Sequence, residues 1–416
     1  MKKNIIFYSD CAFFAGCENM LANFFQNEDF MGRYQVSFFY RYSEEYEAGF
    51  RQRVRRNLRT VPVKLLDLNS VFDLAGKDRW SFLRPVVVGF SHLVLKHFFI
   101  FWNTVRLYCL FRKESADILH VNNGGYPGAY SCASAVIAAR LSGIRRIVYV
   151  VNNIAHSYRP MWRWLDIPCD RAVFRAVSVF VTGSSHARKM LIDALNIDPS
   201  KAVNIFNGIE PRSVTEKREE TLRRLGVEKG RLLIGVVAIL EERKGHAVLL
   251  DSMRILRQEM PEGELPVVLI EGEGPESERL KAYVENEHLD DYVKFVGREE
   301  NVFNFMNAID IMVLPSIAQE DFPNVVLEAM SLGKTVIASS IAGVPEQIDH
   351  MKDGILVAPG SSKDLAGAIG SVMRDDGLRR SLAMKAREKF TIDFSAQRAV
   401  MNYKEMYERL LAEGRA

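Results

Sequence analysis

Two carboxylates on either side of a helix start are the first residues of the chain that suggest chemistry. Glu320 and Glu328 lie eight positions apart in the stretch EDFPNVVLEAMSLGK, and Pro323 stands between them. Proline is favoured at the first position of a helix and glycine just beyond its end, so a helix is predicted from near Pro323 to Gly333. Glu320 then lies in the loop ahead of the helix, and Glu328 lies on its wall. A ligand that uses both carboxylates must therefore run along this helix.

Three further segments place polar or glycine residues between a strand and a helix. Lys244 in EERKGH follows an apolar run and precedes a helix, where its ammonium can reach an anion above the helix N-terminus. The turn GEGPESERL at 272–280 and the turn AGVPE at 342–346 follow apolar runs in the same way. Each signal is weak alone, because a Lys-Gly pair ahead of a helix usually faces solvent and GEG is not the dinucleotide fingerprint.

Strands and helices alternate along the whole chain. In the first half, strands are predicted at NIIFYSD, DILHVNN, RRIVYVVNN and SVFVTGSS, with helices between them. After 205–230 the pattern restarts, with strands at RLLIGVVAIL, PVVLIEG, VKFVG, DIMVLPS and TVIASS. The fold class is therefore α/β, with two Rossmann-like doubly wound domains that face each other across a cleft. The domains are predicted at 1–205 and 206–394, and the segment 395–416 is expected to form a helix that packs toward the first domain.

Composition and charge are those of a globular protein with a basic first half. Of the 416 residues, 48% are hydrophobic and 26% charged, which excludes a disordered chain. Residues 1–200 carry 26 Lys and Arg against 16 Asp and Glu, and the remainder carries 29 against 36. An acidic substrate, an anionic membrane surface or an ordinary basic face would each explain the first half. No nucleic-acid partner is expected, because the basic residues lack interleaved aromatic residues or a known motif.

Cysteine usage and targeting signals favour a cytoplasmic protein. The five cysteines have no zinc-type spacing, so free thiols in a reducing compartment are expected. No signal peptide is visible at the start of the sequence. The apolar run from Pro85 to Phe111 is interrupted by Lys96 and Arg106 and is too short to span a bilayer. Two interpretations stay open: a core helix, or an interfacial helix whose Phe98, Phe101 and Trp102 enter lipid.

The order and spacing of the segments in the second half resemble a known family. NIFNGIE, VVAILEERKGHAVLL, GEGPESERL, VKFVGREENVFNFMNAIDIMVLPS, EDFPNVVLEAMSLGKTVIAS and AGVPEQI occur as in the retaining nucleotide-sugar glycosyltransferases of family 4. That family has the two-domain GT-B fold, and the E-x7-E pair is its signature. The resemblance covers most of the chain and is tightest from Asn204 to Pro359.

The resemblance implies roles for the two carboxylates and the helix between them. Glu320 would accept hydrogen bonds from the hydroxyls of the donor sugar, and Glu328 would hold the ribose of the nucleotide. Backbone amides around Phe322, Asn324 and Val325 would lie against the sugar and phosphates. A sugar diphosphate therefore uses the helix along its length.

The resemblance also implies roles for residues in other loops. Lys244 would neutralise the leaving diphosphate, and Arg243 is a further donor-binding candidate. The base would lie near Gly297 and Arg298, in the loop after VKFVG.

In the first half the resemblance is weaker but gives two candidates. Gly16 falls in a loop where the family often has two glycines near the phosphates, and Ala15 replaces the first of them. His156 falls where the family often has a histidine close to the transferred sugar. Glu320, Lys244 and His156 are therefore the predicted catalytic residues.

Two positions depart from the pattern of the family. Ile239 stands where the family often has a phosphate-binding arginine, and Ala342 replaces the first glycine of a frequent Gly-Gly turn. The first departure predicts weaker phosphate binding, or a cation supplied from the basic first domain. Neither departure removes the E-x7-E pair or the lysine.

The leading hypothesis is a retaining glycosyltransferase that moves a sugar from a UDP- or GDP-sugar to a lipid-linked glycan in polysaccharide or lipopolysaccharide synthesis. It would work in the cytoplasm, with a peripheral place on the inner face of the membrane left open. No cofactor or metal ion is expected, because no Asp-x-Asp motif occurs. A sugar-nucleotide epimerase or a phosphorylase on the same fold is the first alternative, and a non-catalytic binding protein is the second.

Overall fold

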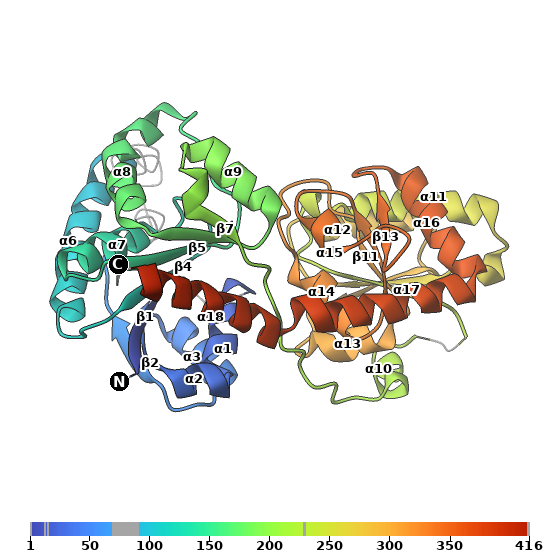
Figure 1. Ribbon diagram of the computed structural model, residues 1–416. Helices are drawn as coiled ribbons and strands as arrows, with labels where there is room; N and C mark the ends of the chain where they lie inside the picture. The colour runs from blue at the N-terminus through green and yellow to red at the C-terminus, as the bar shows by residue number, and fades with distance from the viewer. Residues whose placement is uncertain (1, 12–13, 15, 69–90, 228–229, 414–416) are drawn as a thin grey trace. The chain divides into compact units, whose positions relative to one another are not determined.

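The chain forms two compact units, each built on its own sheet. The computed structural model describes residues 2–11, 14, 16–68, 91–227 and 230–413. Unit 1 comprises Met1–Phe206 and Ala399–Ala416, and unit 2 comprises Asn207–Arg398. Both sheets are parallel and carry helices on both faces (Figure 1). The predicted class of two doubly wound α/β domains is therefore confirmed.

Unit 1 is built on a parallel sheet with the order β3-β2-β1-β4-β5-β6-β7 in the part of the chain that the structure describes. Its strands are β1 (Lys3–Ser9), β2 (Tyr34–Arg41), β3 (Arg59–Val63), β4 (Ile118–Asn123), β5 (Arg146–Val151), β6 (Val179–Thr182) and β7 (Ala202–Asn204). Its helical segments are η1 (Gly16–Glu18), α1 (Asn19–Gln26), α2 (Glu28–Arg33), α3 (Glu44–Arg53), η3 (Ser91–Leu95), α6 (Lys96–Phe111), α7 (Tyr130–Leu141), η4 (Met161–Asp166), α8 (Ile167–Ala176), α9 (Ser185–Leu195) and η5 (Pro199–Lys201).

Alternate side chains of the unit 1 strands pack in two separate hydrophobic cores, one on each face of the sheet. Ile5 and Phe7 of β1 pack with α1 and with the helix α18 (Ala396–Glu413), while Ile6 and Tyr8 pack on the side of α6 and α7. The period of two side chains in a strand produces this division. The C-terminal helix is anchored by polar contact as well, since His120 Nδ1 lies 2.6 Å from the Tyr407 hydroxyl.

Unit 2 is built on a second parallel sheet with the order β10-β9-β8-β11-β12-β13 among the described residues. Its strands are β8 (Leu233–Val237), β9 (Val267–Glu271), β10 (Val293–Gly297), β11 (Ile311–Leu314), β12 (Thr335–Ser339) and β13 (Ile355–Val357). Its helical segments are α10 (Arg218–Arg224), η6 (Glu242–Lys244), α11 (His246–Glu259), η7 (Glu262–Glu264), α12 (Ser277–Asn286), α13 (Val302–Ala308), α14 (Asn324–Ser331), α15 (Val344–Gln347), α16 (Ser362–Arg374), α17 (Asp376–Lys389) and η8 (Phe390–Phe394).

The order of the unit 2 strands reverses between β8 and β11. Going outward from β8, the chain first adds β9 and β10 on one side, and then returns to add β11, β12 and β13 on the other. Figure 1 shows α11, α12 and α16 on one face of this sheet and α10 and α13 on the other. In doubly wound sheets, ligands bind beyond the carboxyl ends of the strands at such a switch point. The loops after β8 and β11 are therefore the place to look for a site.

Two local predictions are refined by the structure. The helix expected to start at Pro323 starts one residue later, because Pro323 has an extended ψ of 121° and serves as the N-cap of α14. The apolar run 85–111 forms η3 and α6 from residue 91 onward, and residues 85–90 lie outside the described part of the chain. Among the described helices, none is both long and apolar enough to cross a membrane.

Candidate functional site

A buried ion pair joins the two loops at the switch point of unit 2. The Lys244 ammonium forms an ion pair with the Glu320 carboxylate, and their side chains are 15% and 7% exposed. The Ser316 hydroxyl donates a hydrogen bond of 2.8 Å to the same carboxylate oxygen. Two residues predicted to act on one donor are thus brought into direct contact. The site combines a cation with a carboxylate that has a fixed orientation.

The short turn η6 places Lys244 at the start of α11. The Lys244 amide donates to the Glu241 carbonyl at 3.0 Å, and Gly245 follows with a left-handed φ of 68°. A Cβ at Gly245 would collide with the Pro315 carbonyl oxygen, so this position requires glycine for two reasons. The Ile317 amide donates 2.8 Å to the Arg243 carbonyl. Backbone contact between the two loops therefore fixes the lysine beside the glutamate.

The guanidinium of Arg243 is held by its own loop and by the loop of Glu320. Its Nε donates to Glu241 at 2.7 Å, and its Nη1 donates to the Gln319 carbonyl at 3.3 Å. Gln319 has a left-handed φ of 53°, an uncommon conformation for a residue with a side chain. Such strain is typical of positions that the surrounding structure holds for a function.

Helix α14 begins four residues after Glu320, at Asn324. Pro323 is the N-cap and has no side-chain group that could accept from the helix amides, and no acidic residue lies in the first turn of α14. Asn324 and Val325 are partly exposed. The N-terminus of a helix favours an anion. The Pro323 carbonyl is held from behind by the buried Gln347, whose Nε2 donates to it at 3.1 Å.

The two other predicted residues of this helix occupy different environments. Phe322 is buried and packs edge-on against Phe394, with ring centroids 5.6 Å apart. Its side chain is therefore part of the unit 2 core, and only its backbone can face a ligand. Glu328 is partly exposed and lies one turn into α14, about 6 Å along the axis from Asn324.

Glycine contacts bring the loops after β8, β9 and β10 together. A Cβ at Gly272 would collide with the Ala238 carbonyl oxygen, and one at Gly274 would lie 2.5 Å from that of Leu240. The Leu240 amide donates to the Glu273 carbonyl at 3.0 Å, and the Gly272 amide donates to the Gly297 carbonyl at 2.9 Å. The GEG turn therefore serves close backbone packing, and it brings Gly297 to the same edge of the sheet as Lys244.

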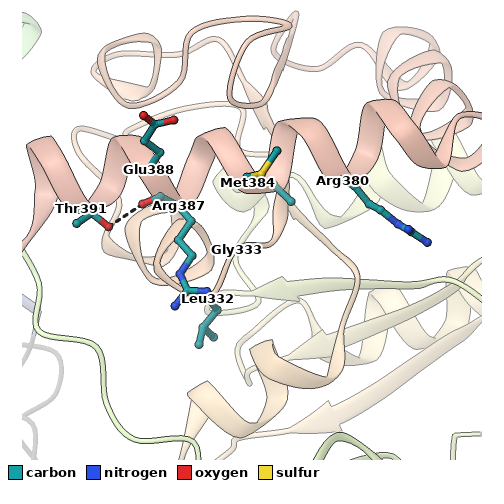
Figure 2. Close-up of a pocket in the computed structure, with 8 residues that line it drawn as sticks. Leu332, Gly333, Arg380, Met384, Arg387, Glu388 and Thr391 are labelled. Carbon is teal, nitrogen blue, oxygen red and sulfur yellow. Dashed lines mark hydrogen bonds between the residues drawn. The ribbon is translucent and has the colours of Figure 1, made fainter.

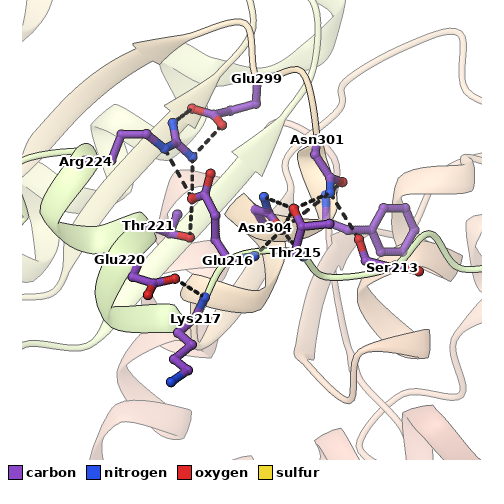
Figure 3. A network of polar contacts seen from close by, with 11 residues as sticks. Ser213, Thr215, Glu216, Lys217, Glu220, Thr221, Arg224, Glu299, Asn301 and Asn304 are labelled. Carbon is purple, nitrogen blue, oxygen red and sulfur yellow. Dashed lines mark hydrogen bonds and ion pairs between the residues drawn. The ribbon is translucent and has the colours of Figure 1, made fainter.

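A polar network fixes the loop that carries Arg298. Arg224 makes hydrogen bonds of 2.8 and 2.9 Å to the two carboxylate oxygens of Glu299, as Figure 3 shows. Asn304 accepts from the Thr215 amide at 2.8 Å and ties the preceding segment to α13. The neighbouring Glu271 carboxylate is buried and accepts from the Glu299 amide at 3.0 Å, and burial raises the pKa of Glu271.

The remaining predicted residues belong to unit 1. Gly16 begins η1 and His156 follows β5, and both are exposed; Ala15 lies outside the described residues. The strand order of unit 1 also reverses, between β1 and β4. At that point Glu18 is fully buried and accepts hydrogen bonds from Ser9 at 2.7 Å, Tyr46 at 2.6 Å and Asn122 at 3.1 Å. Burial raises the pKa of Glu18.

Sequence reasoning missed the residues that support the site from behind. Ser316 orients Glu320, Gln347 holds the start of α14, and the buried His246 begins α11 beside Lys244. Burial, followed by the Lys244 charge, lowers the pKa of His246 to about 4. Each lies near a strand end or a tight turn. No sequence pattern identifies a residue whose role is to hold another side chain or a backbone carbonyl in place.

The two positions that depart from the family pattern differ in their surroundings. Ile239 is 54% exposed, so its apolar side chain is not needed by the core. Ala342 has a left-handed φ of 49°, which explains why glycine is frequent there. The turn is therefore formed despite the alanine.

A wide groove of unit 2 lies away from these residues. The groove lies beyond the C-terminal end of α14 and has a volume of about 540 Å³. Figure 2 draws the residues that line it. It is lined by Leu332, Gly333, Arg380, Ala383, Met384, Arg387, Glu388 and Thr391. None of the predicted site residues lines it. Among the described residues, no group of three or more His, Cys, Asp and Glu side chains is arranged to hold a metal ion.

Comparison with known proteins gives matches along most of the chain. The family model Glycosyltransferase Family 4 matches residues 70–213, and the model Glycosyl transferases group 1 matches residues 217–389. The chain is 29% identical over 238 residues to N-acetyl-alpha-D-glucosaminyl L-malate synthase of Bacillus anthracis, covering 56% of this chain and 60% of that protein. It is 30% identical over 220 residues to an amylovoran biosynthesis glycosyltransferase of Erwinia amylovora, covering 51% of this chain and 52% of that protein. The matched region thus spans little more than half of these relatives.

A solved structure resembles the whole chain. Anabaena HepE, in a crystal structure with UDP, matches with a TM-score of 0.76 and 19% identity, over 98% of this chain and 100% of that chain. At 19% identity, this similarity shows only that the two proteins share a fold, which is that of a two-domain α/β protein.

Proposed function

Because the chain belongs to the family 4 glycosyltransferases, we propose that it transfers a sugar from a nucleotide-sugar donor to a glycan acceptor. The observation that carries the proposal is the Lys244–Glu320 ion pair at the switch point, in the loops that precede α11 and α14. A sugar diphosphate has hydroxyls for the carboxylate and an anion for the ammonium and the helix. The sugar hydroxyls of such a ligand can therefore donate to Glu320, and its diphosphate can bind Lys244 within the same site.

The proposal assigns each donor-site residue of unit 2 the role that the family resemblance implies. Glu320 accepts from the hydroxyls of the transferred sugar, and Lys244 neutralises the diphosphate as its charge develops. Amides of residues 322–325 bind the phosphates and the sugar, and Glu328, one turn along α14, holds the ribose. The loop with Gly297 and Arg298 lies along the base. UDP is a reasonable nucleotide, since HepE has been crystallised with it, and GDP is retained as the other candidate.

The transfer proceeds with retention of configuration. The anomeric carbon loses its bond to the diphosphate oxygen and gains one to the acceptor oxygen on the same face. The acceptor proton passes to the departing diphosphate, so no additional base is required. Lys244 stabilises the negative charge that the leaving group still carries. His156 and Gly16 of unit 1 are assigned to the transferred sugar and the phosphates.

The acceptor is proposed to be a lipid-linked glycan in polysaccharide or lipopolysaccharide synthesis. A relative named for amylovoran biosynthesis supports a polysaccharide product. The basic first half of the chain, with 26 Lys and Arg against 16 Asp and Glu, suits an acceptor at an anionic membrane on the cytoplasmic side.

A thermal-shift screen tests the donor assignment. The protein is melted with UDP, GDP, ADP, CMP and their common sugar conjugates, beside Glu328→Ala and an exposed control on the same unit, Glu278→Ala. One nucleotide should raise the melting temperature of wild type and control by mass action, and Glu328→Ala should lose the shift. If no nucleotide shifts the wild type, the donor site is not formed and a non-catalytic role replaces the proposal. If the donor alone is converted without an acceptor, the protein is an epimerase.

A further inference from the structure

Helix α6 of unit 1 exposes a row of apolar side chains and buries three polar ones beside Ile100, Leu107 and Phe111. Phe98, Phe101, Trp102 and Val105 are exposed, with 64% of Phe101 accessible, and Val94 of η3 continues the row. These five residues are called the aromatic stripe; their spacing of three, four and seven positions places them on one helical face. Lys96, Asn103 and Thr104 of the same helix are buried. A soluble helix normally shows the reverse arrangement.

Buried hydrogen bonds fix this orientation of α6. The Asn103 side chain accepts from the Leu66 amide at 2.9 Å and donates to the Leu66 carbonyl at 2.9 Å. Rotating the helix to hide the aromatic stripe would leave these polar groups without partners, at a cost that apolar burial would not recover. The exposure of the stripe is therefore built into unit 1.

A buried ionic cluster joins a second apolar segment to the helix. Lys96 Nζ lies 2.5 Å from Asp166, which also lies 2.6 Å from Arg163, and Arg163 reaches Asp170 at 3.3 Å. Because Asp166 ends η4, the pair brings η4 against η3 at the start of α6. Two other residues of η4, Trp164 and Leu165, are exposed, with 60% of Trp164 accessible. A segment far from α6 in the sequence thus carries exposed apolar side chains close to the start of that helix.

The exposed charges of residues 91–113, the segment that carries the aromatic stripe, are of one sign. Residues 91–113 contain no Asp or Glu, while Arg106, Arg112 and Lys113 are exposed. Among the described residues, the carboxylates of the ionic cluster that joins η4 to α6, Asp166 and Asp170, are both buried. Aromatic side chains flanked by exposed cations favour the headgroup region of an anionic bilayer. A second copy of the chain would bring the same cations against each other, so the charge pattern disfavours a symmetric dimer.

We propose that the aromatic stripe, with Trp164 and Leu165, is the surface by which unit 1 docks into the interface of an anionic lipid bilayer. The helix lies in the membrane plane, because its 16 residues span about 24 Å and its buried side remains packed on the unit. The proposal is compatible with a lipid-linked acceptor but rests on the surface itself, not on the transferase activity. It concerns residues that the donor site does not use.

Vesicle flotation with the full chain tests the docking surface. Wild type should bind phosphatidylcholine vesicles that contain phosphatidylglycerol, and should bind far less to phosphatidylcholine alone or at high salt. Phe101→Ser/Trp102→Ser should lower the partition coefficient roughly tenfold or more, since two large apolar side chains are lost from the contact. The matched control, Met384→Ser/Ile392→Ser, removes two exposed apolar residues of unit 2 and should bind like wild type.

Further measurements on the same variants distinguish membrane docking from self-association and from misfolding. Equal vesicle binding by Phe101→Ser/Trp102→Ser and wild type would overturn the proposal. A wild-type dimer in sedimentation that becomes a monomer in this variant, without vesicle binding by either, would instead assign the surface to a second copy. An unchanged melting temperature and nucleotide shift in the variant would show that unit 1 folds and that donor binding is separate.

Discussion

The Lys244 ammonium and the Glu320 carboxylate form a buried ion pair across the switch point of the second sheet. The two residues are far apart in the sequence, and each satisfies the charge of the other. A diphosphate or a sugar hydroxyl that enters the site therefore competes with an existing partner. The pair therefore selects ligands by both charge and shape, because a ligand that separates it must supply an anion for Lys244 and a hydrogen-bond donor for Glu320.

The first prediction concerns this pair. Lys244→Met and Glu320→Gln should each lower the free energy of unfolding by about 1–3 kcal/mol, because each removes one charge from a largely buried ion pair. The double variant should lose less than the sum, with a coupling of about 1 kcal/mol or more in urea unfolding. The exposed pair Glu278–Lys281, removed in the same way, should show a coupling below about 0.5 kcal/mol. Additive losses at Lys244 and Glu320 would contradict the pairing.

A second prediction concerns the exposed Ile239. Replacing it by arginine places a cation at the edge of the sheet that carries Lys244, and the free energy of unfolding should change by less than about 0.5 kcal/mol, because the side chain is not in the core. Nucleotide diphosphate affinity should rise several-fold, and the gain should shrink at high salt. Titration calorimetry at low and high salt measures the affinity and its salt dependence. Ile239→Gln provides the uncharged control, and an equal gain with glutamine would exclude a charge effect.

The left-handed Ala342 gives a third prediction. Ala342→Gly should stabilise unit 2 by about 0.5–1 kcal/mol, because relief of the Cβ strain exceeds the added entropy of the unfolded chain. The same change at Ala282, an exposed position within α12, should destabilise by about 1 kcal/mol. Denaturant unfolding distinguishes the two signs. A loss of stability at Ala342 would show that the turn does not strain the alanine.

The buried His246 predicts acid sensitivity of unit 2. Burial lowers the pKa of His246 to about 4, below its ordinary value of 6.5, so the folded state holds the neutral ring. This contribution to stability is complete above pH 6.5 and is lost as the pH falls toward 4. The loss should reach about 2–3 kcal/mol near pH 4.5. His246→Leu should flatten the pH dependence of urea unfolding, whereas His288→Asn, at an exposed histidine, should leave it as in wild type.

The ionic cluster of unit 1 gives the last prediction. Asp166→Asn leaves the buried Lys96 and Arg163 without one of their two carboxylates, so unfolding should become about 3 kcal/mol easier. Because the cluster joins η4 to α6, the same variant should also expose Trp164 more to a collisional quencher of fluorescence. Asp193→Asn, in α9 of the same unit, is the surface control and should change neither quantity. Unchanged stability in Asp166→Asn would mean that the cluster is not formed.

Much of the fold could be predicted from short stretches of the sequence. Short apolar runs bounded by glycine, proline and polar residues gave the strands, and their alternation with helical patterns gave two doubly wound domains. The E-x7-E segment predicted its helix to within one residue, because proline and glycine act on the backbone beside them. The family also followed from the sequence, since its signature segments keep their order whatever their three-dimensional contacts.

The sequence by itself determined which residues stand at strand ends and helix starts, because those positions depend on neighbours in the chain. Only the tertiary structure decided which of them meet. Strand order placed Lys244 against Glu320, and it brought Ser316 and Gln347 behind the site without any motif. The rotation of α6 was equally undetermined by its apolar pattern, which fitted a core helix and an interfacial helix alike. The burial of Lys96 against Asp166 fixed that rotation, because a charged group in the interior requires a partner that only the folded chain supplies.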